Sequence, residues 1–134
     1  IIYSRENFSE QVMEITNGEG VPVVYDGVGA AVHEGSLACL GRFGTYVNFG
    51  AASGHIPPVP GSALATKALY FLRPGLAPHT ATRDLTLEIA NNLFGAVHEG
   101  VKIEINQTYE LRNAVEAHKA LEGRQTTGST VFSV

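Results

Sequence analysis

The chain has 134 residues, of which 44% are hydrophobic and 16% charged, and its formal net charge is −4. This composition is typical of a folded domain with a hydrophobic core and excludes a disordered segment. The acidic balance, without a basic cluster, argues against nucleic acid or an anionic membrane as the main partner, and no apolar run approaches the roughly 20 residues of a membrane helix.

Four elements are expected in the first 50 residues. Apolar residues recur at helical spacing over residues 4–17, and Gly18 ends this helix. A strand is expected over residues 21–25, a glycine turn and a short helix within residues 27–40, and a second strand over residues 45–49. Both strands are nearly continuous apolar runs, which predicts a parallel sheet with helices on both faces.

A long loop and a third strand come next. The loop covers residues 50–61, where glycines and the pair Pro57-Pro58 disfavour regular structure. A short apolar strand is expected over residues 69–72, and it stops at Arg73. Because the composition changes between residues 73 and 82, we expect the sheet part of the chain to be divided there from the last third.

The last third alternates between helix and strand. Apolar residues recur every fourth position from Leu85 to Val97, which predicts an amphipathic helix over residues 83–98. A half-exposed strand is expected over residues 103–109, a helix over 111–121 and a closing strand over 129–134.

Two glycine turns follow the first two strands, and ligands of parallel α/β sheets bind at such carboxyl ends. One turn contains Gly27 and Gly29, and the other begins at Gly50. The segment 27–32 is an incomplete dinucleotide fingerprint, because Val32 occupies the third glycine position and no acidic residue lies about 20 positions later. A turn that lines a cofactor held mainly elsewhere explains this segment better.

Patterns for a metal site or a catalytic nucleophile are missing. His33 and His98 each precede a glutamate but lack a second histidine four positions on, so the zinc-protease pattern fails. Ser53 does not lie in a G-x-S-x-G elbow, and we expect it to offer a hydrogen bond within its loop. The single cysteine, Cys39, is expected in the core, and its lack of a disulfide partner favours a cytoplasmic protein.

Five segments carry a resemblance to a known family: Tyr3-Ser4-Arg5-Glu6-Asn7-Phe8, Val23-Val24-Tyr25-Asp26-Gly27-Val28-Gly29, Phe49-Gly50-Ala51-Ala52-Ser53-Gly54, Phe71-Leu72-Arg73-Pro74-Gly75-Leu76, and the closing run from Tyr109 to Ser129. In this order and spacing they resemble the zeta-crystallin-like quinone oxidoreductases of the medium-chain dehydrogenase/reductase superfamily. The resemblance covers essentially the whole chain. Gly27 and Gly75 depart from it mildly, since serine is common at both places in the family.

The resemblance implies that the chain is the C-terminal part of such an enzyme, less than half of it. Residues 1–100 would be the second half of a Rossmann-like nucleotide-binding domain, and residues 101–134 would return to the catalytic domain as a strand, a helix and a strand. The glycine-rich phosphate loop would lie outside this chain. The intact enzyme would transfer hydride from NADPH to a quinone or an enone-like acceptor, and this branch of the superfamily would use no zinc.

The resemblance also implies which residues contact NADPH. Tyr3 would lie near the adenosine phosphate and Arg124 near the 2′-phosphate. Val28 and Gly29 would line the cofactor after the strand at residues 21–25, and the other residues would lie on the nicotinamide side. No catalytic acid or base and no metal ligand is identified. The full set is Tyr3, Val28, Gly29, Phe49, Gly50, Ala51, Phe71, Leu72, Arg73 and Arg124.

Two other interpretations stay open. The chain could be a dimerisation or assembly module without chemistry, since members of this family pair through the edge strand between Leu69 and Leu72, and an apolar edge strand is a natural pairing surface. We therefore expect a homodimer. The chain could also be a complete small Rossmann-like domain, with residues 27–32 as its true phosphate loop. If the chain is instead the C-terminal part of such an enzyme, the strand over residues 21–25 would lack a neighbouring strand on one edge.

Overall fold

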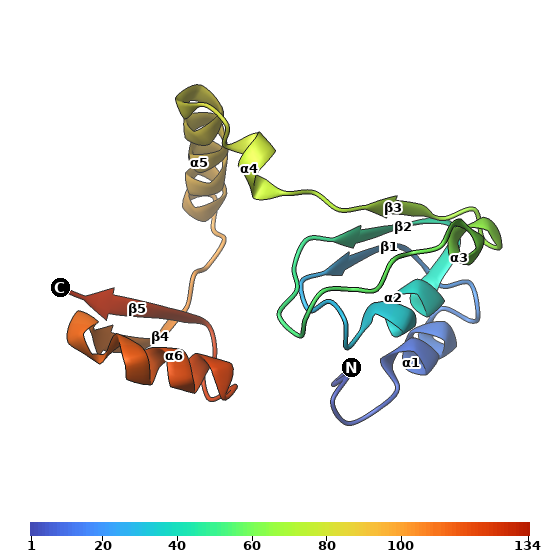
Figure 1. Cartoon of the computed structure of the whole chain (residues 1–134), viewed down its shortest axis with the longest axis horizontal. Coiled ribbons are helices and arrows are strands. Elements are labelled where there is room, and N and C mark those ends of the chain that lie inside the picture. The colour runs from blue at the N-terminus through green and yellow to red at the C-terminus, as the bar shows by residue number, and fades with distance from the viewer. The chain divides into compact units, whose positions relative to one another are not determined.

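The computed structural model describes residues 1–134, which form two compact units, Ile1–Pro78 and His79–Val134 (Figure 1). The division falls within residues 73–82, where the change in composition predicted it. The predicted boundary of the intact enzyme's domains after residue 100 concerns a different division, and it stays a prediction. None of the helices has the length and apolar character needed to cross a membrane.

The first unit is built on a three-stranded parallel sheet. Its elements are α1 (Phe8–Ile15), β1 (Val21–Asp26), α2 (His33–Cys39), β2 (Leu40–Asn48), α3 (Gly61–Ala65) and β3 (Tyr70–Leu72), and α4 (Leu76–His79) follows. The strands lie in the order β1-β2-β3, and both pairs are parallel. The predicted parallel α/β fold is therefore confirmed, and the turns after β1 and β2 open at the same edge of the sheet.

Helix α1 begins four residues later than the sequence predicted. Asn7 is its N-cap, and the Asn7 side chain accepts a hydrogen bond from the backbone N–H of Ser9. A side-chain oxygen at this position satisfies one of the backbone donors that a helix N-terminus leaves free, which fixes where the helix begins. Residues 3–5 form a turn before it.

The core of the first unit lies on one face of the sheet. Leu40, Tyr46 and Leu69 are buried there, with apolar side chains from β1, α2, the loop after β2, α3 and β3 packed against them. Helices α1 and α2 lie together on one side of the sheet (Figure 1).

The opposite face of the sheet is open within this unit. Tyr25 is 73% exposed, and Val23, Tyr70 and Leu72 on the same face are exposed as well. The helices of the first unit therefore cover one face, and helices on the second face stay a prediction.

The second unit contains the long helix and the predicted strand–helix–strand segment. Its elements are α5 (Arg83–His98), β4 (Ile105–Glu110), the 3₁₀ helix η1 (Leu111–Asn113), α6 (Ala114–Glu122) and β5 (Ser129–Ser133). Strands β4 and β5 pair in parallel, with α6 as their connection. Helix α5 has the predicted bounds, and its N-cap Thr82 accepts a hydrogen bond from the N–H of Leu85.

Candidate functional site

The two predicted turns lie against each other at the carboxyl edge of the sheet. We name residues 27–31 the β1 turn and residues 49–54 the β2 turn. They start from paired positions, because Asp26 ends β1 opposite Asn48, the last residue of β2. A Cβ atom at Gly29 would lie less than 3.0 Å from the carbonyl oxygen of Gly54, and one at Gly50 would meet the backbone of Gly27 as closely. The two backbones therefore approach each other in a way that only glycine permits at these positions.

Hydrogen bonds join the two turns directly. The backbone N–H of Ala30 donates to Gly54 O at 3.0 Å. Both the N–H and the hydroxyl of Ser53 donate to Val28 O at 2.7 Å, and the hydroxyl accepts from Ala31 N–H at 2.9 Å. The expected loop hydrogen bond of Ser53 is thus present, and it bridges the two turns.

The buried carboxylate of Asp26 lies at the base of both turns. Its Oδ1 accepts from the N–H groups of Val28 at 2.7 Å and Gly29 at 2.9 Å. Its Oδ2 accepts from the hydroxyl of Tyr46 at 2.6 Å and the side-chain amide of Asn48 at 2.9 Å. Burial alone would raise the pKa of this carboxyl, but the four donors outweigh it and hold the pKa below its ordinary value, so Asp26 is ionised at neutral pH.

Asn48 connects the same carboxylate to the β2 turn. Its Nδ2 donates to Gly50 O at 3.0 Å as well as to Asp26. The backbone carbonyl of Asp26 in turn accepts from the N–H groups of Phe49 at 2.9 Å and Gly50 at 3.2 Å. The side chain and the main chain of Asp26 therefore contact both turns.

Tyr46 and His33 extend this polar cluster into the core. The Tyr46 hydroxyl lies 3.3 Å from Nδ1 of His33, and both side chains are buried. Burial, together with the hydrogen bond to Asp26 and the negative charge there, raises the pKa of Tyr46 well above its ordinary value. Tyr46 therefore keeps its proton at neutral pH and donates a hydrogen bond to Asp26.

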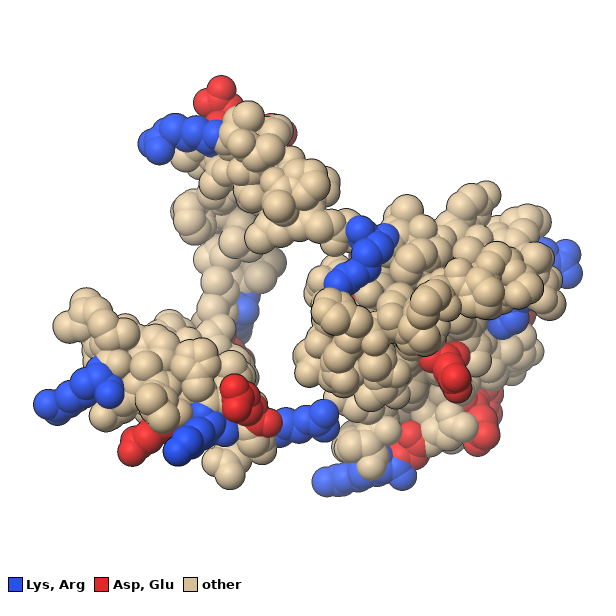
Figure 2. Space-filling model, in the orientation of Figure 1, with Lys and Arg blue, Asp and Glu red and all other residues tan.

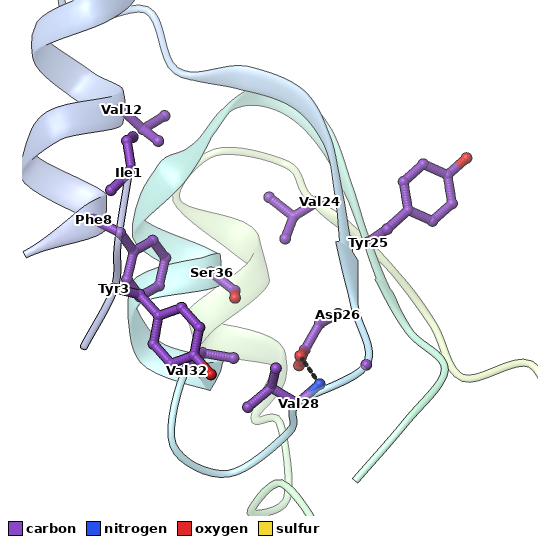
Figure 3. Close-up of a pocket in the computed structure, with 11 residues that line it drawn as sticks. Ile1, Tyr3, Phe8, Val12, Val24, Tyr25, Asp26, Val28, Val32 and Ser36 are labelled. Carbon is purple, nitrogen blue, oxygen red and sulfur yellow. Dashed lines mark hydrogen bonds between the residues drawn. The ribbon is translucent and has the colours of Figure 1, made fainter. Parts of the chain in front are cut away.

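A cavity of about 280 Å³ lies beside the β1 turn (Figure 3). It is lined from three elements and the N-terminal segment, by Ile1, Tyr3, Phe8, Val12, Val24, Tyr25, Asp26, Gly27, Val28, Val32 and Ser36. Figure 3 shows the side chains of Val24 and Asp26 on the cavity side of the strand, and that of Tyr25 on the other side. Tyr3 thus borders the same cavity as the β1 turn.

A second cavity, of about 320 Å³, lies at the carboxyl ends of β2 and β3. Arg73, Asn48 and Phe71 line it together with the loop residues His55, Ile56, Pro57, Pro58 and Val59. The guanidinium of Arg73 donates from Nη1 to Asn48 O at 2.8 Å, so this side chain ties the end of β3 to the end of β2. The Phe71 ring lies 5.5 Å from that of Tyr46.

The structure brings together most, but not all, of the residues that the sequence singled out. Val28, Gly29, Phe49, Gly50 and Ala51 lie in the two facing turns. Phe71 and Arg73 lie at the neighbouring strand end, whereas the side chain of Leu72 lies on the open face of the sheet. Arg124 belongs to the second unit, where it has a φ of 55° just after α6, and its place in the site stays a prediction.

The sequence reasoning missed Asp26 and Asn48. Both are polar residues at the end of an apolar strand, one or two positions before a glycine. An aspartate whose side chain accepts from the N–H two residues ahead is a recognised turn former. That pattern was available in the sequence for Asp26, while the role of Asn48 depends on the pairing of the two strands.

A family model described as "Zinc-binding dehydrogenase" matches residues 1–132. A quinone oxidoreductase of Pseudomonas aeruginosa is 44% identical over 134 residues, and a 2-haloacrylate reductase of a Burkholderia species is 40% identical over 135 residues. The match covers 98% of this chain in both cases, with 41% of the first relative and 40% of the second.

Among solved structures, the Escherichia coli quinone oxidoreductase complexed with NADPH superimposes with a TM-score of 0.88 and 40% identity. The match covers 99% of this chain and 42% of that structure. The chain thus spans about two fifths of the length of the proteins it matches. It belongs to the zinc-binding dehydrogenase family, within which it corresponds to the C-terminal part of quinone oxidoreductases of the medium-chain dehydrogenase/reductase type.

Proposed function

We propose that this chain forms the nicotinamide side of an NADPH site in an oxidoreductase that transfers hydride to a quinone or an enone-like acceptor. The observation that carries the proposal is the pair of glycine turns at adjoining carboxyl ends of parallel strands, where α/β proteins bind nucleotides. The 44% identity to a quinone oxidoreductase and the likeness to an NADPH complex support the choice of cofactor and acceptor. The reductase of 2-haloacrylate among the relatives supports the enone-like alternative.

The residues of this chain would bind and orient the cofactor. NADPH itself supplies the hydride. Backbone groups of the β1 turn would line the cofactor and those of the β2 turn would lie under the nicotinamide, which Arg73 and Phe71 would border from the end of β3. Tyr3 and Arg124 would lie toward the adenosine phosphates. These assignments follow the family resemblance, and no side chain here is proposed as a general acid or base.

The family's description implies zinc, and the residues of this chain do not fit it. They contain no group of three or more His, Cys, Asp and Glu side chains that could hold a metal ion. Structural and catalytic zinc sites need three or four such ligands around one point. We therefore propose no zinc ligand among the residues of this chain.

Titration of the ¹⁵N-labelled chain with NADPH tests this proposal. We expect amide signals of Val28, Gly29 and Gly50 to shift, with an affinity weaker than micromolar, because the pyrophosphate-binding helix of the family has no counterpart in this chain. The nucleotide 2′,5′-ADP is the matched control, since it lacks the nicotinamide and should leave the Gly50 signal unchanged. Shifts confined to other residues, or none at millimolar NADPH, would refute the proposal.

A role in assembly is the second candidate, and the exposed apolar edge of the sheet favours it. Tyr70 and Leu72 on β3 are 60% and 52% exposed, and β3 pairs with β2 along one edge only. We propose that two copies pair through β3 as a homodimer of a cytoplasmic protein. Sedimentation should show a dimer that Tyr70→Lys weakens, because a charged side chain on an edge strand disfavours pairing and Tyr70 is exposed. A strictly monomeric profile at high concentration would contradict pairing.

A further inference from the structure

We propose that Asp26 and Asn48 are positioning residues, which hold the β1 and β2 turns in the arrangement that faces the nicotinamide. The inference rests on the proposed function for the identity of the ligand. It assigns a role to two side chains that border the cavities and are almost closed to solvent, Asp26 being 3% and Asn48 1% exposed.

The two oxygens of the Asp26 carboxylate have different partners. Oδ1 accepts only from the backbone of the β1 turn, at Val28 and Gly29. Oδ2 accepts only from side chains of β2, at Tyr46 and Asn48. One charge therefore fixes the β1 turn on one side and the end of β2 on the other.

Asn48 carries the effect of this charge to the β2 turn. Its Nδ2 has two hydrogens, and its two short contacts are to Asp26 Oδ2 at 2.9 Å and Gly50 O at 3.0 Å. The carbonyl of Gly50 is thereby fixed in its orientation by the Asn48 side chain. The adjoining N–H groups of Phe49 and Gly50 are taken by the main chain of Asp26. Both turns thus depend on the geometry around one carboxylate.

The charge matters for position as well as for stability. Hydrogen bonds to an ionised acceptor are shorter and about twice as strong as neutral ones, so they hold turn amides more firmly. In Asp26→Asn, an amide nitrogen would replace one oxygen. If it replaces Oδ2, it faces the Asn48 nitrogen, donor against donor; if it replaces Oδ1, it faces the two turn amides. Either orientation disturbs one turn directly and shifts the other.

The experiment compares three variants of the chain with the wild type, at a temperature where each is folded by circular dichroism. Asp26→Asn should speed amide hydrogen exchange at Val28, Gly29 and Gly50 and weaken NADPH binding roughly five- to tenfold. Asn48→Ala should speed exchange at Gly50 and leave Val28 and Gly29 protected. Tyr46→Phe is the matched control in the same cluster: it lowers the melting temperature but keeps the exchange pattern of both turns.

Three results would overturn the proposal. One is equal NADPH affinity in Asp26→Asn and wild type. Another is unchanged exchange at the turn amides in that variant. The third is a loss of turn protection in Tyr46→Phe that matches the loss in Asp26→Asn, since Asp26 would then act only through general stability. If wild-type chain fails to bind NADPH, the proposed function fails, and the exchange pattern still decides whether Asp26 and Asn48 hold the turns. If Asp26→Asn does not fold, Asn48→Ala decides through the difference between the two turns.

Discussion

Substitution of Gly29 by alanine should lower the free energy of unfolding more than most glycine-to-alanine substitutions in the first unit. Gly29 has a φ of +89°, where a side chain costs about 1–2 kcal/mol. The new Cβ would also overlap the backbone of Gly54 and Ala51, and such forced repacking costs about 1–3 kcal/mol. Because backbone atoms cannot rotate away, we expect the two costs to add to about 2–5 kcal/mol of lost unfolding free energy.

Alanine substitutions at two other glycines measure the cost of the positive φ and the cost of the backbone overlap separately. Gly18 has a φ of +85° with no atom within 4 Å of an added Cβ, so Gly18→Ala carries the backbone cost alone. Gly50 has no positive φ, but its Cβ would overlap Gly27, so Gly50→Ala carries the overlap alone. Urea unfolding followed by tyrosine fluorescence suits this comparison, because four of the five tyrosines lie in the first unit. A Gly29→Ala variant no less stable than Gly18→Ala would refute the close approach of the two turns.

Three further predictions concern charge and capping. The pKa of Asp26 is lowered in the folded state, so its contribution to stability should be present above about pH 4. This contribution should be lost as the pH falls through the folded-state pKa. Urea unfolding across this range should show that the unfolding free energy declines less toward acid in Asp26→Asn than in the wild type. Burial raises the pKa of the Cys39 thiol, although the charge of Lys67 partly offsets this rise, and the residue is only 3% exposed. Alkylation of Cys39 by iodoacetamide at neutral pH should therefore require unfolding, and its rate should increase with added urea. Lys67 donates from Nζ to the carbonyls of Ala38 and Leu40 at the end of α2. Lys67→Met should therefore lower the unfolding free energy by about 1–2 kcal/mol. The control Lys102→Met, at an exposed position in the second unit, should change the unfolding free energy little.

The sequence predicted the order and type of the main elements well. Residues 83–98 form the expected helix with its expected bounds, because the apolar spacing is regular and Thr82 caps it. The parallel pairing of β1 with β2 was also expected, since a short helix between two apolar runs leaves little alternative. The predicted glycine turns lie together for the same reason.

Features that depend on tertiary contacts were beyond the sequence. Arg73 donates to the carbonyl of Asn48, a partner 25 residues away that no local pattern indicates. The spacing of His118 from Leu111 and Val115 predicts a shared helical face and a packed position, but His118 is exposed on α6. A periodic pattern identifies a face of a helix, and the neighbour that covers that face comes from elsewhere in the chain.

The polar cluster around Asp26 also has a consequence for how accurately the chain folds. If β2 slipped by one residue against β1, Tyr46 and Asn48 would turn to the open face, and the carboxylate would be enclosed without two of its donors. Leaving a buried charge short of partners costs about 3–5 kcal/mol, which adds to the loss of the Tyr46 ring from the core. The buried charge therefore strengthens the preference of the two strands for a single register.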